Sequence, residues 1–166
     1  MDLDTVARLV GYHHWATDRL LAAAAGLPAE RLDRPLGGSF STGRGLLTHV
    51  IGVERLWLER WNGGTPTQMP DLSGCDTPED FRSEWNDIEA GQQRFMTALS
   101  RVGLTQPLTY TSLRGGTYTY PLADVLHHVV NHGTYHRGQI AHFLRQQGET
   151  PPSTDYLLYL DEKCRR

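Results

Sequence analysis

The stretch LHHVVNHGTYHRG, residues 126–138, carries histidines at positions 128, 132 and 136, four residues apart. Residues at this spacing in an α-helix lie one above another on the same face, so neighbouring histidines can reach a single ion. Apolar residues recur at helical spacing from residue 121 to residue 147, and Gly148 and Pro151 follow. The pattern predicts a long helix that ends there and that carries a metal-binding face.

The angle between each histidine and the apolar face of this helix indicates which histidines point into the protein. Its members are Leu122, Val125, Leu126, Val129, Gly133, Ile140 and Leu144. At about 100° per residue, His136 lies roughly 30° from the centre of this face, His132 roughly 70° and His128 roughly 110°. We therefore expect His132 and His136 to face the interior, His128 to lie at the edge and His127 to face solvent. A lone inward histidine is more often a hydrogen-bonded core residue, but one cation would satisfy two such buried rings together.

Two earlier segments have the same helical period. Apolar residues predict a first helix over residues 4–25, which Gly26 and Pro28 end. A second helix is predicted to begin after Ser39 and Ser41, which are suitable N-caps, and to end at residues 62–64, which read Asn-Gly-Gly. Residues 65–76 are rich in proline, glycine and polar residues and predict a surface loop.

A third helix and a hairpin complete the expected architecture. Thr77 followed by Pro78 is a typical helix start, and apolar residues recur from there to Leu99. Residues 107–120 alternate in character and are split by two glycines, which predicts a β-hairpin. Residues 155–160 are expected to pack as a tail. The predicted fold is all-α, a single domain over residues 1–166 forming an up-and-down four-helix bundle with a short β-hairpin between the third and fourth helices.

A third metal ligand is expected from the second helix. His49 lies at the edge of the apolar stripe of that helix, beside Val53, where a site that opens to solvent would be located. His13 shares the apolar stripe of the first helix, and we interpret it as a pocket wall, with an outer partner or a fourth ligand as alternatives. Glu54 falls on the inward face near Trp57, which favours either an ion pair with an arginine or a role in moving protons.

Composition narrows the class of protein. The chain has 166 residues, a formal net charge of -3 and eight histidines, and its only lysine is Lys163. No segment gathers the basic residues that would follow a phosphate backbone, so nucleic acid is not an expected partner. Neither a signal peptide nor a membrane span is expected. Cys75 and Cys164 are far apart in sequence and match no paired spacing, which fits a reducing cytoplasm.

Several motifs of the sequence resemble the DinB/YfiT family of metal-binding four-helix bundles, and the resemblance covers nearly the whole chain. The resemblance rests on Tyr12 with Trp15 and Ala16, Ser39-Phe40-Ser41 before Leu47-Thr48-His49, Glu54 with Trp57-Leu58, the hairpin tyrosines Tyr110, Tyr118 and Tyr120, and His128 through Asn131-His132 to His136-Arg137-Gly138-Gln139-Ile140. In that family one histidine of the second helix and two of the fourth bind the metal. The resemblance therefore assigns the ligands to His49, His132 and His136.

The resemblance also implies a function. Similar proteins include bacillithiol S-transferases and mycothiol-dependent maleylpyruvate isomerase, so we expect a divalent-metal-dependent enzyme that transfers a low-molecular-weight thiol to a small-molecule substrate in a stress or DNA-damage response. A metal-dependent hydrolase and a non-catalytic metal-binding stress protein are the alternatives. Imidazole nitrogens suit several metals, of which zinc is our first expectation and nickel the second. The family further implies a homodimer.

Overall fold

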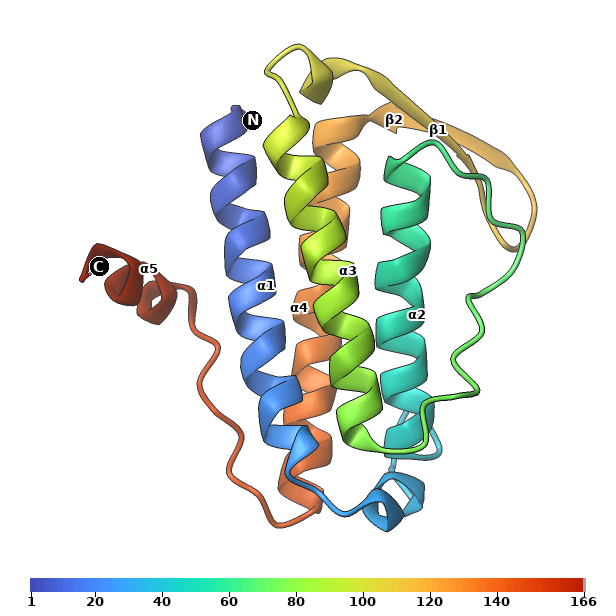
Figure 1. Ribbon diagram of the computed structural model, residues 1–166, viewed down its shortest axis with the longest axis vertical. Helices are drawn as coiled ribbons and strands as arrows, with labels where there is room; N and C mark the ends of the chain where they lie inside the picture. The colour runs from blue at the N-terminus through green and yellow to red at the C-terminus, as the bar shows by residue number, and fades with distance from the viewer. Residues whose placement is uncertain (166) are drawn as a thin grey trace.

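Four long helices pack side by side in the computed structural model, which describes residues 1–165 (Figure 1). They are α1 (Leu3–Ala25), α2 (Gly43–Trp61), α3 (Pro78–Ala98) and α4 (Leu122–Gln146). Two short 3₁₀ segments, η1 (Ala29–Asp33) and η2 (Gly103–Thr105), lie in the connections. The predicted four-helix bundle is confirmed. No described helix is both long and apolar enough to cross a membrane.

Side-chain caps explain where these helices begin. The side chain of Asp2 accepts a hydrogen bond from the backbone of Thr5 at the start of α1. Thr77 caps α3, as expected from the sequence, and forms a reciprocal capping box with Asp80. Helix α2 is capped by Thr42 and not by either serine that precedes it. Each cap satisfies a backbone N–H group that has no partner inside the helix.

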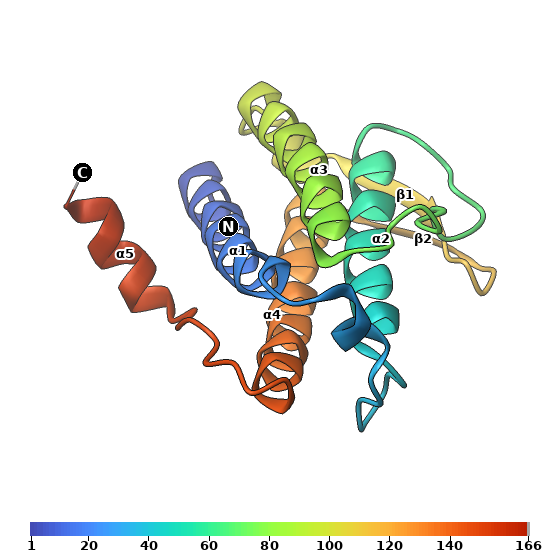
Figure 2. The same cartoon turned by 60° about the horizontal axis from the view of Figure 1, so that its bottom comes forward.

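The direction of the helices differs from simple alternation. Figure 1 shows that α2 and α3 run the same way, because the chain after α2 returns along the whole bundle before α3 begins. Helix α1 packs against α3 and α4, and α2 packs against the same two helices. Figure 2 shows the resulting arrangement from the end of the bundle. Both α3 and α4 therefore contact α1 and α2, and α4 is the one of the two that carries the histidine run.

The hairpin lies across one end of the bundle, above α2 and α4 (Figure 1). Strands β1 (Pro107–Thr111) and β2 (Thr117–Pro121) pair antiparallel, with Tyr110 opposite Tyr118. Gly115 and Gly116 both have positive φ angles near 85°, a conformation that the tight turn requires and that side chains disfavour. The predicted hairpin is confirmed. It brings several tyrosines over the open end of the bundle.

The C-terminal segment, for which the sequence predicted packing but no secondary structure, forms a short helix, α5 (Tyr156–Cys164). It lies beside α1, outside the bundle (Figure 2). The rings of Tyr12 and Tyr159 meet edge to face at 5.8 Å, and the indole N–H of Trp15 donates to Glu162 at 2.9 Å. These aromatic contacts supply the burial that a helix of nine residues needs to be stable.

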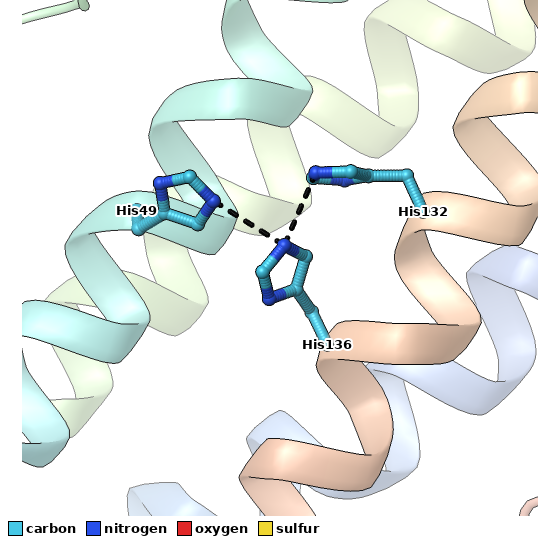
Figure 3. Close-up of side chains that lie close together, drawn as sticks. All are labelled: His49, His132 and His136. Carbon is cyan, nitrogen blue, oxygen red and sulfur yellow. Dashed lines mark hydrogen bonds between the residues drawn. The ribbon is translucent and has the colours of Figure 1, made fainter. Parts of the chain in front are cut away.

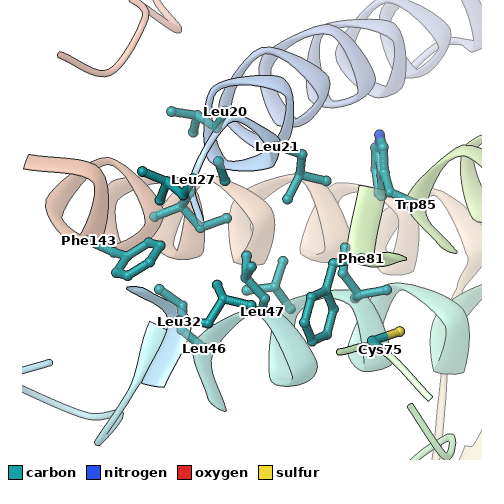
Figure 4. Packing of buried hydrophobic residues seen from close by; sticks show 14 of the residues in the cluster. Leu20, Leu21, Leu27, Leu32, Leu46, Leu47, Cys75, Phe81, Trp85 and Phe143 are labelled. Carbon is teal, nitrogen blue, oxygen red and sulfur yellow. The ribbon is translucent and has the colours of Figure 1, made fainter. Parts of the chain in front are cut away.

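The apolar core is divided into two clusters. One surrounds Phe81, Trp85 and Phe143 (Figure 4), and the other lies toward the hairpin around Trp57 and Val129. Along α1, α3 and α4, buried polar residues separate the positions that belong to the two clusters: His13, His14 and Thr17 on α1, Gln92 on α3, and His136 with Arg137 on α4. A polar layer thus crosses the middle of the bundle. The candidate site lies at this level.

Candidate metal centre

Three imidazole rings meet between α2 and α4. The Nε2 atom of His136 lies 3.2 Å from Nε2 of His49 and 3.1 Å from Nε2 of His132. One ligand atom from each of the three histidines lies within 4.8 Å of the other two. Figure 3 shows the rings of the two helices pointing toward one common space. The structure therefore brings together the three residues that the sequence singled out.

The geometry of these nitrogens fits a divalent cation. Nitrogens that share a tetrahedral zinc ion at about 2.0–2.1 Å lie roughly 3.4 Å apart, close to the two distances that join His136 to His49 and to His132. The Nδ1 atom of His136 donates to Oε1 of Gln139 at 2.6 Å, so Nε2 of the neutral His136 ring carries no proton. That lone pair faces the Nε2 atoms of two further rings. A bound cation would accept a lone pair from all three.

The three rings are held in the neutral form that metal binding needs. Burial lowers the pKa of His49 and of His136 below the ordinary imidazole value. Burial, reinforced by the neighbouring His136, lowers the pKa of His132 to about 4. At neutral pH each ring therefore keeps one nitrogen without a proton, as a metal ligand requires. The cluster could therefore hold a metal ion.

The remaining histidines of α4 lie outside the cluster. His128 is exposed, and its ring lies 5.9 Å from that of His132 and 5.5 Å from that of Trp57. His127 is also exposed and pairs with Asn131 at 3.1 Å, which agrees with its predicted direction. Of the three candidates for two ligand positions on this helix, the inward pair His132 and His136 is the one that meets His49.

Two hollows flank the cluster along α4. One, of about 370 Å³, lies under the hairpin and includes His128 and Trp57 in its wall. The other, of about 360 Å³, lies on the opposite side of the cluster along the helix and includes Phe40 and Gln139. The ring of Phe40 lies 5.2 Å from that of His49 and 6.1 Å from that of His136. Neither lining includes the three cluster histidines themselves, but each hollow contains a neighbour of one of them: His128 beside His132, and Gln139 beside His136.

A buried polar chain runs beside the centre. Arg137, the residue after His136, donates from Nη1 to Nδ1 of His13 at 2.8 Å. The opposite ring nitrogen of His13, Nε2, lies 3.2 Å from Oε1 of Glu54, within ion-pair distance but without the alignment of a hydrogen bond. Both side chains are 2% exposed. The two contacts link Arg137 of α4, His13 of α1 and Glu54 of α2.

Gln92 extends this chain to α3. Its amide nitrogen donates to Oε2 of Glu54 at 3.0 Å, and its amide oxygen lies 2.7 Å from Nε2 of His14. Burial works against the charge of Glu54, but His13 and the bond from Gln92 outweigh it and lower the pKa of the carboxyl. Burial, with His13 nearby, lowers the pKa of His14 to about 4. The network ties all four long helices together at the level of the metal centre.

This network corrects two expectations from the sequence. His13 is buried against the backbone of α4 at Gly133 and lies in neither hollow, so it does not form the pocket wall that we expected. Glu54 is buried as expected, but its direct partners are His13 and Gln92 instead of an arginine. Sequence analysis also missed Gln139, although its spacing of three residues from His136 on a helix was available as a signal.

Comparison with known proteins agrees over almost the full length. A model of the DinB family matches residues 2–166. Protein DinB of Bacillus subtilis strain 168 is 30% identical over 165 residues, which cover 95% of this chain and 94% of that protein. The crystal structure of a DinB-like protein from Bacillus cereus ATCC 10987 has a TM-score of 0.73 at 17% identity and covers 92% of this chain and 97% of that chain. The likeness to the Bacillus cereus structure shows a shared fold.

Proposed function

The chain belongs to the DinB family, and on that premise we propose that it is a divalent-metal-dependent enzyme that transfers a low-molecular-weight thiol to an electrophilic small molecule. The observation that carries the proposal is the convergence of Nε2 atoms from His49, His132 and His136. Three neutral nitrogen ligands leave at least one coordination position free, which is typical of catalytic rather than structural sites. Zinc is our first choice of metal and nickel the second.

The side chains around the cluster have distinct tasks in this proposal. His49, His132 and His136 would hold the cation, which when bound would supply a positive charge that favours the thiolate form of a thiol. Gln139 fixes the ring of His136 through the bond to Nδ1. Phe40 packs beside the rings of His49 and His136, between them and the second hollow.

The transfer itself balances without an oxidant or a reductant. The thiol loses its proton to solvent, its sulfur forms a bond to an electrophilic carbon, and the group displaced from that carbon leaves as an anion. With an activated double bond as electrophile, nothing leaves and the proton is taken up by the neighbouring carbon. The two hollows on either side of the histidines offer separate room for the thiol and the electrophile.

The hydrolytic alternative is less well supported by the geometry. It needs a group that accepts a proton from water beside the metal, and the sequence offered Glu54 and His13 for that task. Both are 2% exposed, and both are engaged inside the bundle with Gln92 and Arg137. A buried pair of this kind braces the fold more readily than it exchanges protons with a bound water.

Metal content tests the first part of the proposal. Protein purified without a histidine tag should carry about one equivalent of zinc or nickel by elemental analysis, and His49→Ala, His132→Ala and His136→Ala should each carry little. His128→Ala is the matched control, because this residue lies on the same face of α4 but outside the cluster. Equal metal content in all four variants, at equal folding by circular dichroism, would refute the site.

Thiol consumption tests the second part. Metal-loaded protein should accelerate the loss of a cellular low-molecular-weight thiol in the presence of an electrophile, and His132→Ala should not. Product formed without added thiol would point to hydrolysis instead. Metal bound with no turnover of either kind, together with a lower melting temperature in His49→Ala, would identify a non-catalytic metal-binding protein.

The expected partners are a small-molecule substrate and a second copy of this chain. Dimerisation and a cytoplasmic location stay predictions, and sedimentation equilibrium is the measurement for the first. Trp57 and Trp61, which could have served an interface, are both 6% exposed and belong to the core. A dimer would therefore have to use other surfaces.

A further inference from the structure

The hollow under the hairpin has walls from three elements. Its floor comes from α2 and α4 and its outer edge from the hairpin, which crosses the end of the bundle above them (Figure 1). Six residues line it: Trp57, Tyr110, Tyr120, Asp124, Val125 and His128. Four of the six present flat rings. A volume of about 370 Å³ lies within the range that small-molecule sites occupy, roughly 300–1,000 Å³.

One wall is a fixed aromatic stack. The ring of Trp57 meets that of Tyr110 edge to face, at 5.1 Å and 71°. The guanidinium of Arg60 lies 4.7 Å from the centre of the Trp57 ring and 4.6 Å from that of Tyr110, and it is held by a bond to the carbonyl oxygen of Thr111 at 3.0 Å. These partners hold the wall in place, so it needs no rearrangement to meet a ligand. Because Trp57 is only 6% exposed, a ligand would touch a small part of its ring and would stack mainly on the more exposed Tyr120.

The opposite side has a single charge. Asp124 is the only charged residue among the described side chains that line the hollow, and it is exposed at the start of α4. Burial lowers the pKa of His128, which favours the neutral ring at physiological pH. Arg60 belongs to the wall behind Trp57 and Tyr110 rather than to the lining. Asp124 disfavours an anion, and the positive charge of Arg60 behind the two rings disfavours a cation. The lining therefore suits an uncharged ligand with a hydrogen-bond donor.

The hollow is adjacent to the metal centre. His128 is part of its lining, and the ring of His128 lies 5.9 Å from that of the metal-centre residue His132. A ligand beside His128 would therefore lie one helical turn of α4 from His132. The other hollow, beyond Phe40 and Tyr135, leaves room for the second reactant.

We propose that this hollow is the electrophile site of the transferase, and that it selects planar, uncharged aromatic molecules that carry a hydrogen-bond donor for Asp124. The inference rests on the proposed function. In the reaction, the thiol sulfur bonds to a ring carbon of the electrophile, the leaving group departs with the bonding electrons, and the thiol proton goes to solvent. Tyr120 closes the outer side of the site and determines how firmly the ring is held.

Binding can be tested apart from turnover with an unreactive probe. 2,4-Dinitroaniline is planar, uncharged and carries an amino donor, and 1,3-dinitrobenzene is its match without the donor. Each is titrated into metal-free and metal-loaded protein by calorimetry, with His128 ring signals followed by NMR. We expect saturable binding of 2,4-dinitroaniline that shifts the His128 signals, and binding of 2,4-dinitrobenzoate at least tenfold weaker.

Two exposed hairpin tyrosines supply the matched variants. Tyr120→Ala should weaken binding of both neutral probes about five- to tenfold, because a stacking wall is lost. Tyr118→Ala is the control, in the same strand and similarly exposed (43% against 47%). Its ring packs beside Tyr110 and Tyr120 but does not line the hollow, so this variant should bind within about twofold of wild type. Asp124→Asn should weaken 2,4-dinitroaniline about fivefold and leave 1,3-dinitrobenzene unchanged, since only the former offers a hydrogen to a carboxylate that accepts more strongly than an amide.

The outcomes separate this inference from the proposed function. Equal binding by Tyr120→Ala and Tyr118→Ala, tighter binding of the benzoate, or probe binding that leaves His128 unmoved would overturn the electrophile site even if metal and thiol turnover are present. Binding that follows the expected pattern in a protein that consumes no thiol would refute the transferase and with it the ligand's role as electrophile. Where the protein turns over a chlorinated dinitrobenzene as electrophile, Tyr120→Ala should raise KM for that substrate and change kcat little.

Discussion

Gln139 and His136 lie on consecutive turns of α4, and the amide oxygen of Gln139 accepts from Nδ1 of His136 at 2.6 Å. The amide nitrogen of Gln139 lies 3.4 Å from the hydroxyl of Tyr135, an arrangement that orients the amide. The bond between Gln139 and Nδ1 of His136 determines which nitrogen of His136 carries the proton. It therefore also determines that the lone pair of Nε2 is directed at His49 and His132.

Gln139→Ala is expected to weaken metal binding about 10- to 100-fold, because the orienting bond to His136 is lost while all three ligands remain. Competition with a chromophoric chelator measures the affinity. Tyr135→Phe, which removes only the distant hydroxyl contact of Gln139, is the control and should stay within about threefold of wild type. Unchanged affinity in Gln139→Ala would mean that packing alone orients His136.

The stability of the metal-free protein is expected to fall as pH drops from about 6.5 to about 4. His14 has a folded pKa of about 4, because it is buried, whereas the unfolded chain takes up the proton near 6.5. The unfolded state thus binds more protons in this window, and at about 1.4 kcal/mol per pKa unit the loss from His14 is on the order of 3 kcal/mol. His132 adds to the same trend.

Urea denaturation at pH 7, 5.5 and 4, with a chelator present, measures this dependence. His14→Gln should have a clearly shallower decline than wild type, although it is less stable at pH 7. The same replacement at the exposed His142 controls for the loss of an imidazole. A decline in His14→Gln as steep as in wild type would assign the effect to other groups.

Gly133→Ala is expected to destabilise the protein by about 1–3 kcal/mol, the usual range for overpacking a core. A Cβ atom there would lie 2.4 Å from Cε1 and 2.5 Å from Nδ1 of His13, a ring that Arg137 and Glu54 hold in place. Gly138→Ala, on the same helix with no atom near the new methyl group, should stabilise by about 0.5–1 kcal/mol. Opposite signs in urea denaturation would support the close packing of α1 on α4, and equal signs would contradict it.

Glu54→Gln is expected to lower the free energy of unfolding by about 1.5–3 kcal/mol, because it replaces a buried carboxylate that accepts from Gln92 and faces Nε2 of His13 by a weaker, uncharged acceptor. The matched variant is Glu59→Gln on the exposed face of the same helix, which should change stability by less than about 0.5 kcal/mol. A double-mutant cycle with His13→Asn should show non-additivity of at least about 1 kcal/mol. Additive effects would mean that the two side chains do not interact energetically.

Local patterns in the chain were sufficient for most of the fold. The four long helices, the hairpin and the helix start at Thr77 depend on residues within a few positions of one another, so periodicity and turn residues predicted them. The same holds for His132 and His136, because the helical repeat alone puts residues four apart on one face. The start of α2 was misassigned by a residue or more, since Ser39, Ser41 and Thr42 all have capping side chains and only Thr42 is positioned to use one.

The meeting of distant residues was decided by tertiary structure. That His49 reaches the pair on α4 depends on how α2 packs there, and the parallel course of α2 and α3 depends on the long return between them (Figure 1). The buried chain from Arg137 through His13 to Glu54 joins three helices, and no spacing within one helix specifies it. The hollow of Trp57, Tyr110 and Tyr120 likewise exists only because the hairpin folds over the bundle. Sequence by itself determined which surfaces of each helix are apolar and which carry side chains able to bind a metal, because these properties are local; packing, which sums many weak contacts over the whole chain, determined which of those surfaces meet.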